Sequence, residues 1–166
     1  MHEDLLFSQL RLIAAHPLTY NTRTKDQGAA QLLRTKEAIM PHIKDFKGKV
    51  LQCAASNGTK IAQTGKLKNS GLGELFDLVF ISEDVGAEKP AKEFFDKALA
   101  DVRAQIGEVA LDEILMIGDS LTSDIQGANN AGIKACWYNP KGVPCDKDVQ
   151  VDYEIKDLHK IYEILG

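Results

Sequence analysis

Four short apolar runs, separated by segments with helical spacing, dominate the chain from about residue 49 onward. Continuous apolar runs of this length are typical of strands that are buried on both faces of a parallel sheet. The predicted strands cover residues 50–55, 78–81, 114–117 and 135–138, and the predicted helices cover residues 61–70, 92–102, 123–131 and 157–165. This alternation predicts a doubly wound, Rossmann-like α/β fold with a parallel sheet.

Individual residues mark the ends of the predicted helices. Gly71 and Gly132 stand where a helix C-terminus favours a residue that can adopt positive φ. Asp157 precedes the last apolar pattern and is a plausible N-cap, since its side chain can accept a backbone N–H hydrogen bond.

The first part of the chain is less regular. Residues 28–46 have helical spacing with an interruption near Pro41, and residues 17–25 are polar and irregular. We therefore divide the chain into an N-terminal segment, residues 1–48, and an α/β core, residues 49–166.

Composition narrows the possible functions. A chain of 166 residues with 44% hydrophobic residues suits one domain with a real core. The net charge is −4 and no basic block occurs, so we expect no nucleic-acid partner, because phosphate contacts need clustered Lys and Arg. No apolar run approaches the length that spans a membrane, so we expect no membrane partner either. Nothing in the sequence predicts an oligomeric state.

The three cysteines, Cys53, Cys136 and Cys145, are odd in number and widely spaced. They fit reduced thiols better than a disulfide framework, which predicts a cytoplasmic location. The four histidines form no zinc-ligand spacing with them.

Polar residues follow three of the predicted strands, where ligands of such sheets bind. Ser56-Asn57-Gly58 follows the first, Lys89 comes after the second, and Asp119 and Asp124 follow the third. A hydroxyl with nearby backbone N–H groups can bind phosphate, lysine supplies a positive charge, and two carboxylates can hold Mg²⁺. This combination suits phosphoryl transfer, which depends mainly on positioning and charge neutralisation.

Each of these residues also has an ordinary structural interpretation. Asn57-Gly58 could form a hairpin turn, although a helix follows here. Lys89 could be a solvated residue before a helix that starts with proline. Asp119 and Asp124 could simply stabilise the N-terminus of the next helix. Their order on successive strand ends favours the functional interpretation.

Four segments then resemble the haloacid dehalogenase (HAD) superfamily of hydrolases, in particular its pyrimidine 5′-nucleotidase-like branch. They are AASNG at residues 54–58, QTGKL at 63–67, FISEDVGAEKP at 80–90 and MIGDSLTSDIQGANNAG at 116–132. The resemblance covers more than half of the chain, and the last segment is highly specific. It implies a Mg²⁺-dependent phosphatase of small phosphorylated molecules, built on the HAD type of parallel sheet.

The resemblance also implies roles for individual residues. Ser56 would bind the substrate phosphate, helped by the backbone of Asn57 and Gly58. Lys89 would stabilise the transferring phosphoryl group. Asp119 would ligate Mg²⁺, with Asp124 beside it either as a ligand or one step removed.

One family motif is not found. Family members begin with a strand that ends in Asp-x-Asp-x-Thr, in which the first Asp is the nucleophile and the second is the general acid and base. The Asp-x-Asp of this chain is Asp146-Lys147-Asp148, which lies in a polar segment with no apolar strand before it, so we reject it as the catalytic pair.

Two explanations of the N-terminus are open. Residues 4–7 could be the family's opening strand, which would put Ser8 at the nucleophile position and Leu10 at the acid position. Alternatively, residues 3–15 could be an amphipathic helix left after a deletion. We favour the strand, because the opening strand of the family lies between two others whose edges would otherwise stay unpaired in the core.

The family's cap domain also has little room. About thirty residues separate Leu12 from Phe46, so we expect a reduced or absent cap. We therefore predict a HAD-like phosphatase of very low activity. The alternatives are a non-catalytic phosphate- and Mg²⁺-binding or regulatory module, or a piece that another chain completes.

Overall fold

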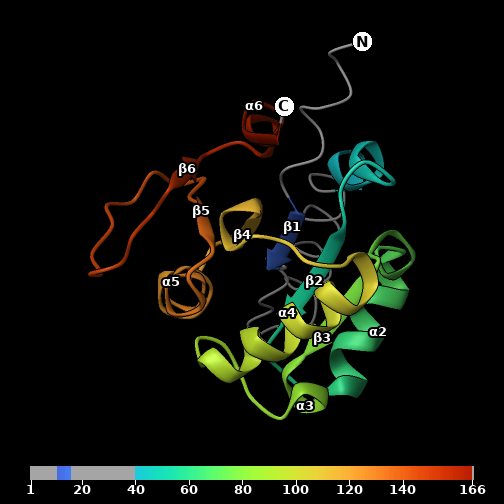
Figure 1. Cartoon of the computed structure of the whole chain (residues 1–166). Coiled ribbons are helices and arrows are strands. Elements are labelled where there is room, and N and C mark those ends of the chain that lie inside the picture. Colours follow the sequence, from blue (N-terminus) through green and yellow to red (C-terminus); the bar gives the residue numbers. More distant parts are fainter. Residues whose placement is uncertain (1–10, 16–39, 166) are drawn as a thin grey trace.

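The computed structural model describes residues 11–15 and 40–165 of the chain (Figure 1). Within these residues, six parallel strands form one sheet in the order β3-β2-β1-β4-β5-β6. The strands are β1 Arg11–Ala15, β2 Gln52–Ser56, β3 Leu78–Ile81, β4 Ile114–Gly118, β5 Lys134–Tyr138 and β6 Tyr153–Ile155. The doubly wound parallel α/β fold predicted from the sequence is confirmed.

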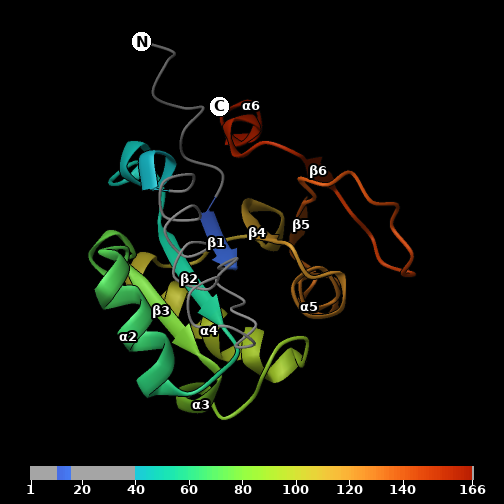
Figure 2. The same cartoon turned by 180° about the vertical axis from the view of Figure 1, so that it is seen from behind.

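Helices cover both faces of this sheet. Residues 40–46 are helical, and the α-helices that follow are α2 Lys60–Ser70, α3 Ser82–Val85, α4 Lys92–Ile106, α5 Gln126–Ala131 and α6 Ile161–Leu165. Short 3₁₀ turns cover Gly73–Leu75, Leu111–Glu113 and Leu158–Lys160, and a π-helical turn covers Leu121–Ile125. Helix α4 lies in front of the sheet in Figure 1 and behind it in Figure 2.

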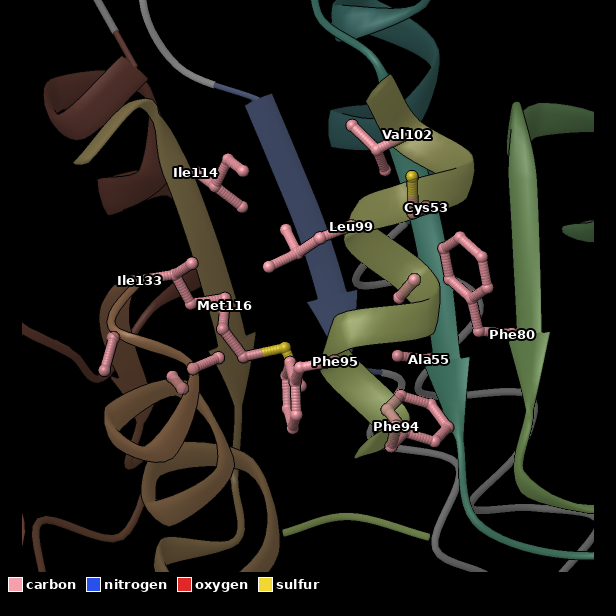
Figure 3. Packing of buried hydrophobic residues seen from close by; sticks show 14 of the residues in the cluster. Cys53, Ala55, Phe80, Phe94, Phe95, Leu99, Val102, Ile114, Met116 and Ile133 are labelled. Carbon is pink, nitrogen blue, oxygen red and sulfur yellow. The ribbon is translucent and has the colours of Figure 1, made fainter. Parts of the chain in front are cut away.

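The core has two halves because successive residues of a strand point to opposite faces. On β4, Ile114 and Met116 pack with α4 and α5, whereas Leu115 and Ile117 pack with residues 40–46, α2 and α6. Figure 3 shows the first half, in which side chains of α4 meet those of β2, β3 and β4. The thiols of Cys53 and Cys136 are buried in different halves, and burial raises the pKa of each to about 12.

The predicted elements agree closely with the observed ones. Gly71 and Gly132 end α2 and α5 with φ of 72° and 73°. Asp157 is confirmed as an N-cap, although a 3₁₀ turn precedes α6. The predicted helix at residues 123–131 begins within the π-helical turn, and β6 was not predicted because Tyr153–Ile155 is too short and polar for an apolar run. No helix among the described residues is long and apolar enough to cross a membrane.

The position predicted for the central strand is wrong. The strand between β2 and β4 is Arg11–Ala15, with Ile13 paired to Cys53 on one side and to Met116 on the other. The prediction that both central edges need a partner is thus confirmed, and Arg11–Ala15 supplies it, whereas residues 4–8 lie outside the described residues. The alternative of one helix over residues 3–15 is also wrong for residues 11–15.

The reason is that Leu12, Ile13, Ala14 and Ala15 form a continuous apolar run, which suits a strand buried on both faces. Ser8 and Leu10 lie outside the described residues. Between β1 and residue 40 stand residues 16–39, so at most a reduced cap fits between them.

At two helical glycines, we expect an added methyl group to change the stability of the protein in opposite directions. A Cβ on Gly127 of α5 would lie 2.6 Å from Cζ of the fully buried Phe95, whereas a Cβ on Gly65 of α2 would have no neighbour within 4 Å. We expect Gly127→Ala to destabilise the protein by about 1–3 kcal/mol through overpacking. Gly65→Ala should stabilise it by about 0.5–1 kcal/mol, since alanine loses less backbone entropy. Urea unfolding measures both, and a Gly127→Ala variant as stable as the wild type would contradict the close packing of α5 on α4.

Candidate active site

The predicted site residues lie at one edge of the sheet. Ser56 is the last residue of β2, Asp119 directly follows β4, and Asp124 lies in the π-helical turn after it. Because all strands are parallel, these C-terminal ends share an edge, and β1 lies between β2 and β4. Lys89 comes from the segment that follows β3 and α3.

A buried ion pair joins the two sides of this edge. The Lys89 Nζ atom lies 2.6 Å from Asp124 Oδ1 and donates a second hydrogen bond of 3.0 Å to the carbonyl oxygen of Ala55. The Lys89 and Asp124 side chains are only 6% and 5% exposed. A lone buried charge would be very unfavourable, so each of these two charges stabilises the other.

Backbone geometry after β4 holds Asp124 in place. Its Oδ2 atom accepts a 3.2 Å hydrogen bond from the Ser120 amide, and Ser123 Oγ lies 3.5 Å from Oδ1. Gly118 at the end of β4 makes room, because a Cβ there would collide with the Asp124 carboxylate. Glycine is thus required for close approach rather than for an unusual φ.

Asp119 is more exposed than the buried Asp124, although its carboxyl group is partly shielded from solvent. Partial burial of its carboxyl group raises its pKa, the negative charge of Asp124 raises it further, and Lys89 opposes the shift. The backbone carbonyl of Asp119 accepts a 3.1 Å hydrogen bond from Nε1 of Trp137, which fixes the loop at the end of β4. Two neighbouring carboxylates that repel each other are a suitable environment for a cation.

The segment after β2 is only partly arranged as predicted. Ser56 Oγ lies 3.4 Å from the carbonyl oxygen of Asn57. The Gly58 amide, which we expected to face phosphate, donates a 2.9 Å hydrogen bond to Ser82 Oγ. The roles of Ser56, Asn57 and Gly58 in phosphate binding therefore stay predictions, and Gly58 would have to exchange a partner to fulfil its role.

Asp119 and Asp124 would supply only part of a Mg²⁺ site and do not form a complete metal centre. Asp119 offers an exposed carboxylate, while both Asp124 oxygens already accept hydrogen bonds and suit an indirect role. In the described part of the chain, no group of three or more His, Cys, Asp or Glu side chains could hold a metal. Asp146 and Asp148 are exposed in the segment between β5 and β6.

Sequence reasoning missed two residues that build this site, Trp137 and Ser82, and it missed the role of the Asn57 side chain. Trp137 holds the Asp119 loop, Ser82 accepts from Gly58, and the Asn57 side chain contacts the backbone of Lys89. Trp137 is the single tryptophan of the chain, which is the signal that could have drawn attention to it. The other two contacts join residues 24 and 32 positions apart, which no local pattern predicts.

Comparison with known families shows which family shares the residues of this site. The model of the haloacid dehalogenase-like hydrolase family matches residues 7–138, which is most of the chain. This chain belongs to the haloacid dehalogenase-like hydrolase family. The matched residues contain Ser56, Lys89, Asp119 and Asp124, so the resemblance seen in the sequence is confirmed at the level of the family.

Two curated relatives of this HAD chain are nucleotidases. It is 43% identical to the pyrimidine 5′-nucleotidase PynA of Streptococcus pneumoniae over 68% of its own length and 46% of that protein. It is 36% identical to the pyrimidine 5′-nucleotidase YjjG of Escherichia coli over 66% of its own length and 47% of that protein. The HAD chain thus spans about half the length of these relatives.

A solved structure shows the same fold. The magnesium-bound HAD-hydrolase YfnB of Bacillus subtilis superimposes with a TM-score of 0.71 at 32% identity. The alignment covers 84% of this chain and 62% of that one. A HAD phosphatase of Thermococcus onnurineus gives a TM-score of 0.70 at 28% identity, covering 87% and 66% of the two chains.

We expect weak Mg²⁺ binding that depends on Asp119. Mg²⁺ dehydrates reluctantly and needs several converging oxygen ligands, whereas Asp119 is the carboxylate best placed to bind it directly. Titration calorimetry should show weak binding to the wild type and none to Asp119→Ala. Asp112→Ala is the matched control, because it removes an exposed carboxylate from the turn before β4. Tight binding that survives Asp119→Ala would contradict the assignment.

Proposed function

We propose that this HAD chain binds the phosphate group of small phosphomonoesters at the edge formed by β2, β1 and β4, and hydrolyses them very slowly by itself. The observation that carries the proposal is the buried pair of Lys89 and Asp124, in which Lys89 also bonds to Ala55, the residue before Ser56. A lysine ammonium has three protons, and among the described residues Lys89 donates hydrogen bonds to two partners. Its third proton is available for an anionic oxygen of the substrate.

Each residue has a separate part in this proposal. Ser56 and Lys89 bind the phosphoryl oxygens, Asp124 orients Lys89, and Asp119 holds Mg²⁺ with water. When bound, Mg²⁺ would neutralise negative charge that develops on the transferring group. The nucleotidase and phosphatase relatives support a small phosphorylated substrate.

Low activity follows from the missing aspartates. β1 occupies the central position of the sheet, and residues 11–20, which include it and the five residues after it, contain neither Asp nor Glu. Without a carboxylate nucleophile the positioning groups alone would leave an acceleration over water on the order of 10³-fold, as other enzymes retain when their nucleophile is removed. Binding without hydrolysis, or completion by another chain, is the second candidate for the same reason.

An assay with a generic phosphomonoester and Mg²⁺ tests this proposal. We expect turnover far below the ordinary enzymatic range of about 1 to 10³ per second. The residual rate should fall further in Lys89→Met and stay unchanged in Asp146→Asn, which alters the exposed segment between β5 and β6. Turnover in the ordinary range would show that a nucleophile has been overlooked, and its loss in Asp146→Asn would place that nucleophile at Asp146.

Three further expectations belong to this proposal. We expect residues 1–48 to act as a segment that adds β1 to the core of residues 49–166. We expect a reducing, cytoplasmic setting, because Cys53, Cys136 and Cys145 are free thiols. We expect no nucleic-acid partner, given the net charge of −4 without a basic block, and no membrane partner, since no apolar run of the sequence approaches spanning length.

A further inference from the structure

The side chain of Asn57 is paired with the backbone of Lys89. Asn57 Nδ2 donates to the Lys89 carbonyl oxygen at 2.9 Å, and the Lys89 amide donates to Asn57 Oδ1 at 2.9 Å. The nitrogen and the oxygen of the Asn57 side-chain amide thus both bond to the same residue, and this pairing defines which of the two atoms is the oxygen. The contact resembles one rung of a β-ladder between residues that are 32 positions apart.

This contact lies between the two ends of the candidate site. Asn57 directly follows Ser56 at the end of β2, while the Lys89 side chain reaches under the same edge to Ala55 and Asp124. A lysine side chain has four rotatable bonds and loses considerable entropy when it is held in one place. When the Lys89 backbone is held in place, the ion pair has to order only the side chain.

Two other side-chain amides bond to the backbone next to this contact. Gln63 Nε2 donates to the Asn57 carbonyl oxygen at 3.2 Å, and Asn130 Nδ2 donates to the Pro90 carbonyl oxygen at 2.9 Å. Neither of them bonds to Lys89 itself. Asn57 is therefore distinguished by joining the residue next to Ser56 directly to the peptide unit that carries the buried ammonium.

We propose that Asn57 is a positioning residue whose side chain holds Lys89 in register with Ala55 and Asp124. Its importance for phosphate binding rests on the proposed function, but its effect on Lys89 does not. The role differs from the backbone contact to phosphate that the family resemblance implies for the same residue.

Chemical modification of lysines tests this directly. Reductive methylation followed by peptide mass analysis gives a rate for each lysine of the folded protein. In the wild type, Lys89 should react far more slowly than the exposed Lys60 and Lys92, because its side chain is 6% exposed and ion-paired. In Asn57→Ala the rate at Lys89 should rise on the order of tenfold, since two part-buried hydrogen bonds to its backbone are lost.

Controls separate this effect from general loosening. Gln63→Ala and Asn130→Ala each remove a side-chain amide from the same region and should leave the Lys89 rate unchanged. In a separate measurement, the buried thiols of Cys53 and Cys136 should stay unreactive toward a thiol-alkylating reagent in every variant that remains folded. If Asn57→Ala does not fold, Asn57→Asp keeps the acceptor and loses the donor, and should raise the Lys89 rate by an intermediate amount.

Two outcomes would overturn the proposal: a Lys89 rate that is unchanged in the folded Asn57 variants, or an equal rise in the Gln63→Ala control. A second measurement follows the binding of inorganic phosphate through the fluorescence of Trp137, which contacts the Asp119 loop. Asn57→Ala should weaken phosphate binding in the wild type and have no further effect in a Lys89→Met background. If the wild type binds no phosphate, the proposed function fails, while the modification rates still decide the role of Asn57.

Discussion

Replacing Asp124 with alanine is expected to destabilise the folded protein by about 3–5 kcal/mol, because it leaves the Lys89 ammonium buried without its partner. The Nζ and Oδ1 atoms are 2.6 Å apart and both side chains are almost fully buried. Solvent therefore cannot replace the lost carboxylate without opening the edge of the sheet. Urea unfolding followed by circular dichroism measures the change in free energy.

An exposed ion pair provides the matched control. Lys92 and Asp96 lie 2.5 Å apart on α4, but their side chains are 62% and 53% exposed, so Asp96→Ala should change stability by less than about 1 kcal/mol. The double variant Lys89→Met with Asp124→Leu should regain most of the stability lost in Asp124→Ala, because no unpaired charge remains. Equal small effects of Asp124→Ala and Asp96→Ala would contradict the buried pair.

Placing aspartates immediately after β1 is expected to raise phosphatase activity by at least about 10²-fold, the contribution of one well-placed acid or base. In the family, the nucleophile and the acid–base residue stand two positions apart at the C-terminal end of the opening strand. β1 ends at Ala15, so the change is His16→Asp with Leu18→Asp. The choice of positions follows from chain order alone, since both residues lie outside the described part of the chain.

The corresponding change before β1 is the control. Ser8→Asp with Leu10→Asp introduces the same two carboxylates ahead of the central strand, and we expect no gain from it. Any gained activity should be lost when Lys89→Met is added, because the new nucleophile would still need the buried ammonium. If the changes at residues 8 and 10 raised the activity instead, they would contradict the assignment of Arg11–Ala15 as the strand that leads into the catalytic edge. Only partial recovery is expected, because a reduced cap excludes water poorly.

Most of the architecture could be predicted because its signals are local. Runs such as residues 114–117 are apolar at every position, which is what a strand between two helical layers requires. Gly71 and Gly132 end helices because positive φ is readily adopted only by glycine. The central strand was misplaced because residues 3–15 carry apolar side chains at spacings that suit more than one element, and its position depends on which run pairs with both β2 and β4.

The sequence by itself determined the fold class, the edge at which Ser56, Lys89, Asp119 and Asp124 gather, and the lack of an Asp-x-Asp pair after any N-terminal strand. Only the tertiary structure decided that Arg11–Ala15 is the central strand, that Lys89 is paired with Asp124, and that Asn57 holds the Lys89 backbone. The physical reason is separation along the chain. Lys89 is 35 residues from Asp124 and 32 from Asn57, and contacts of that kind form only when the sheet brings the ends of different strands together.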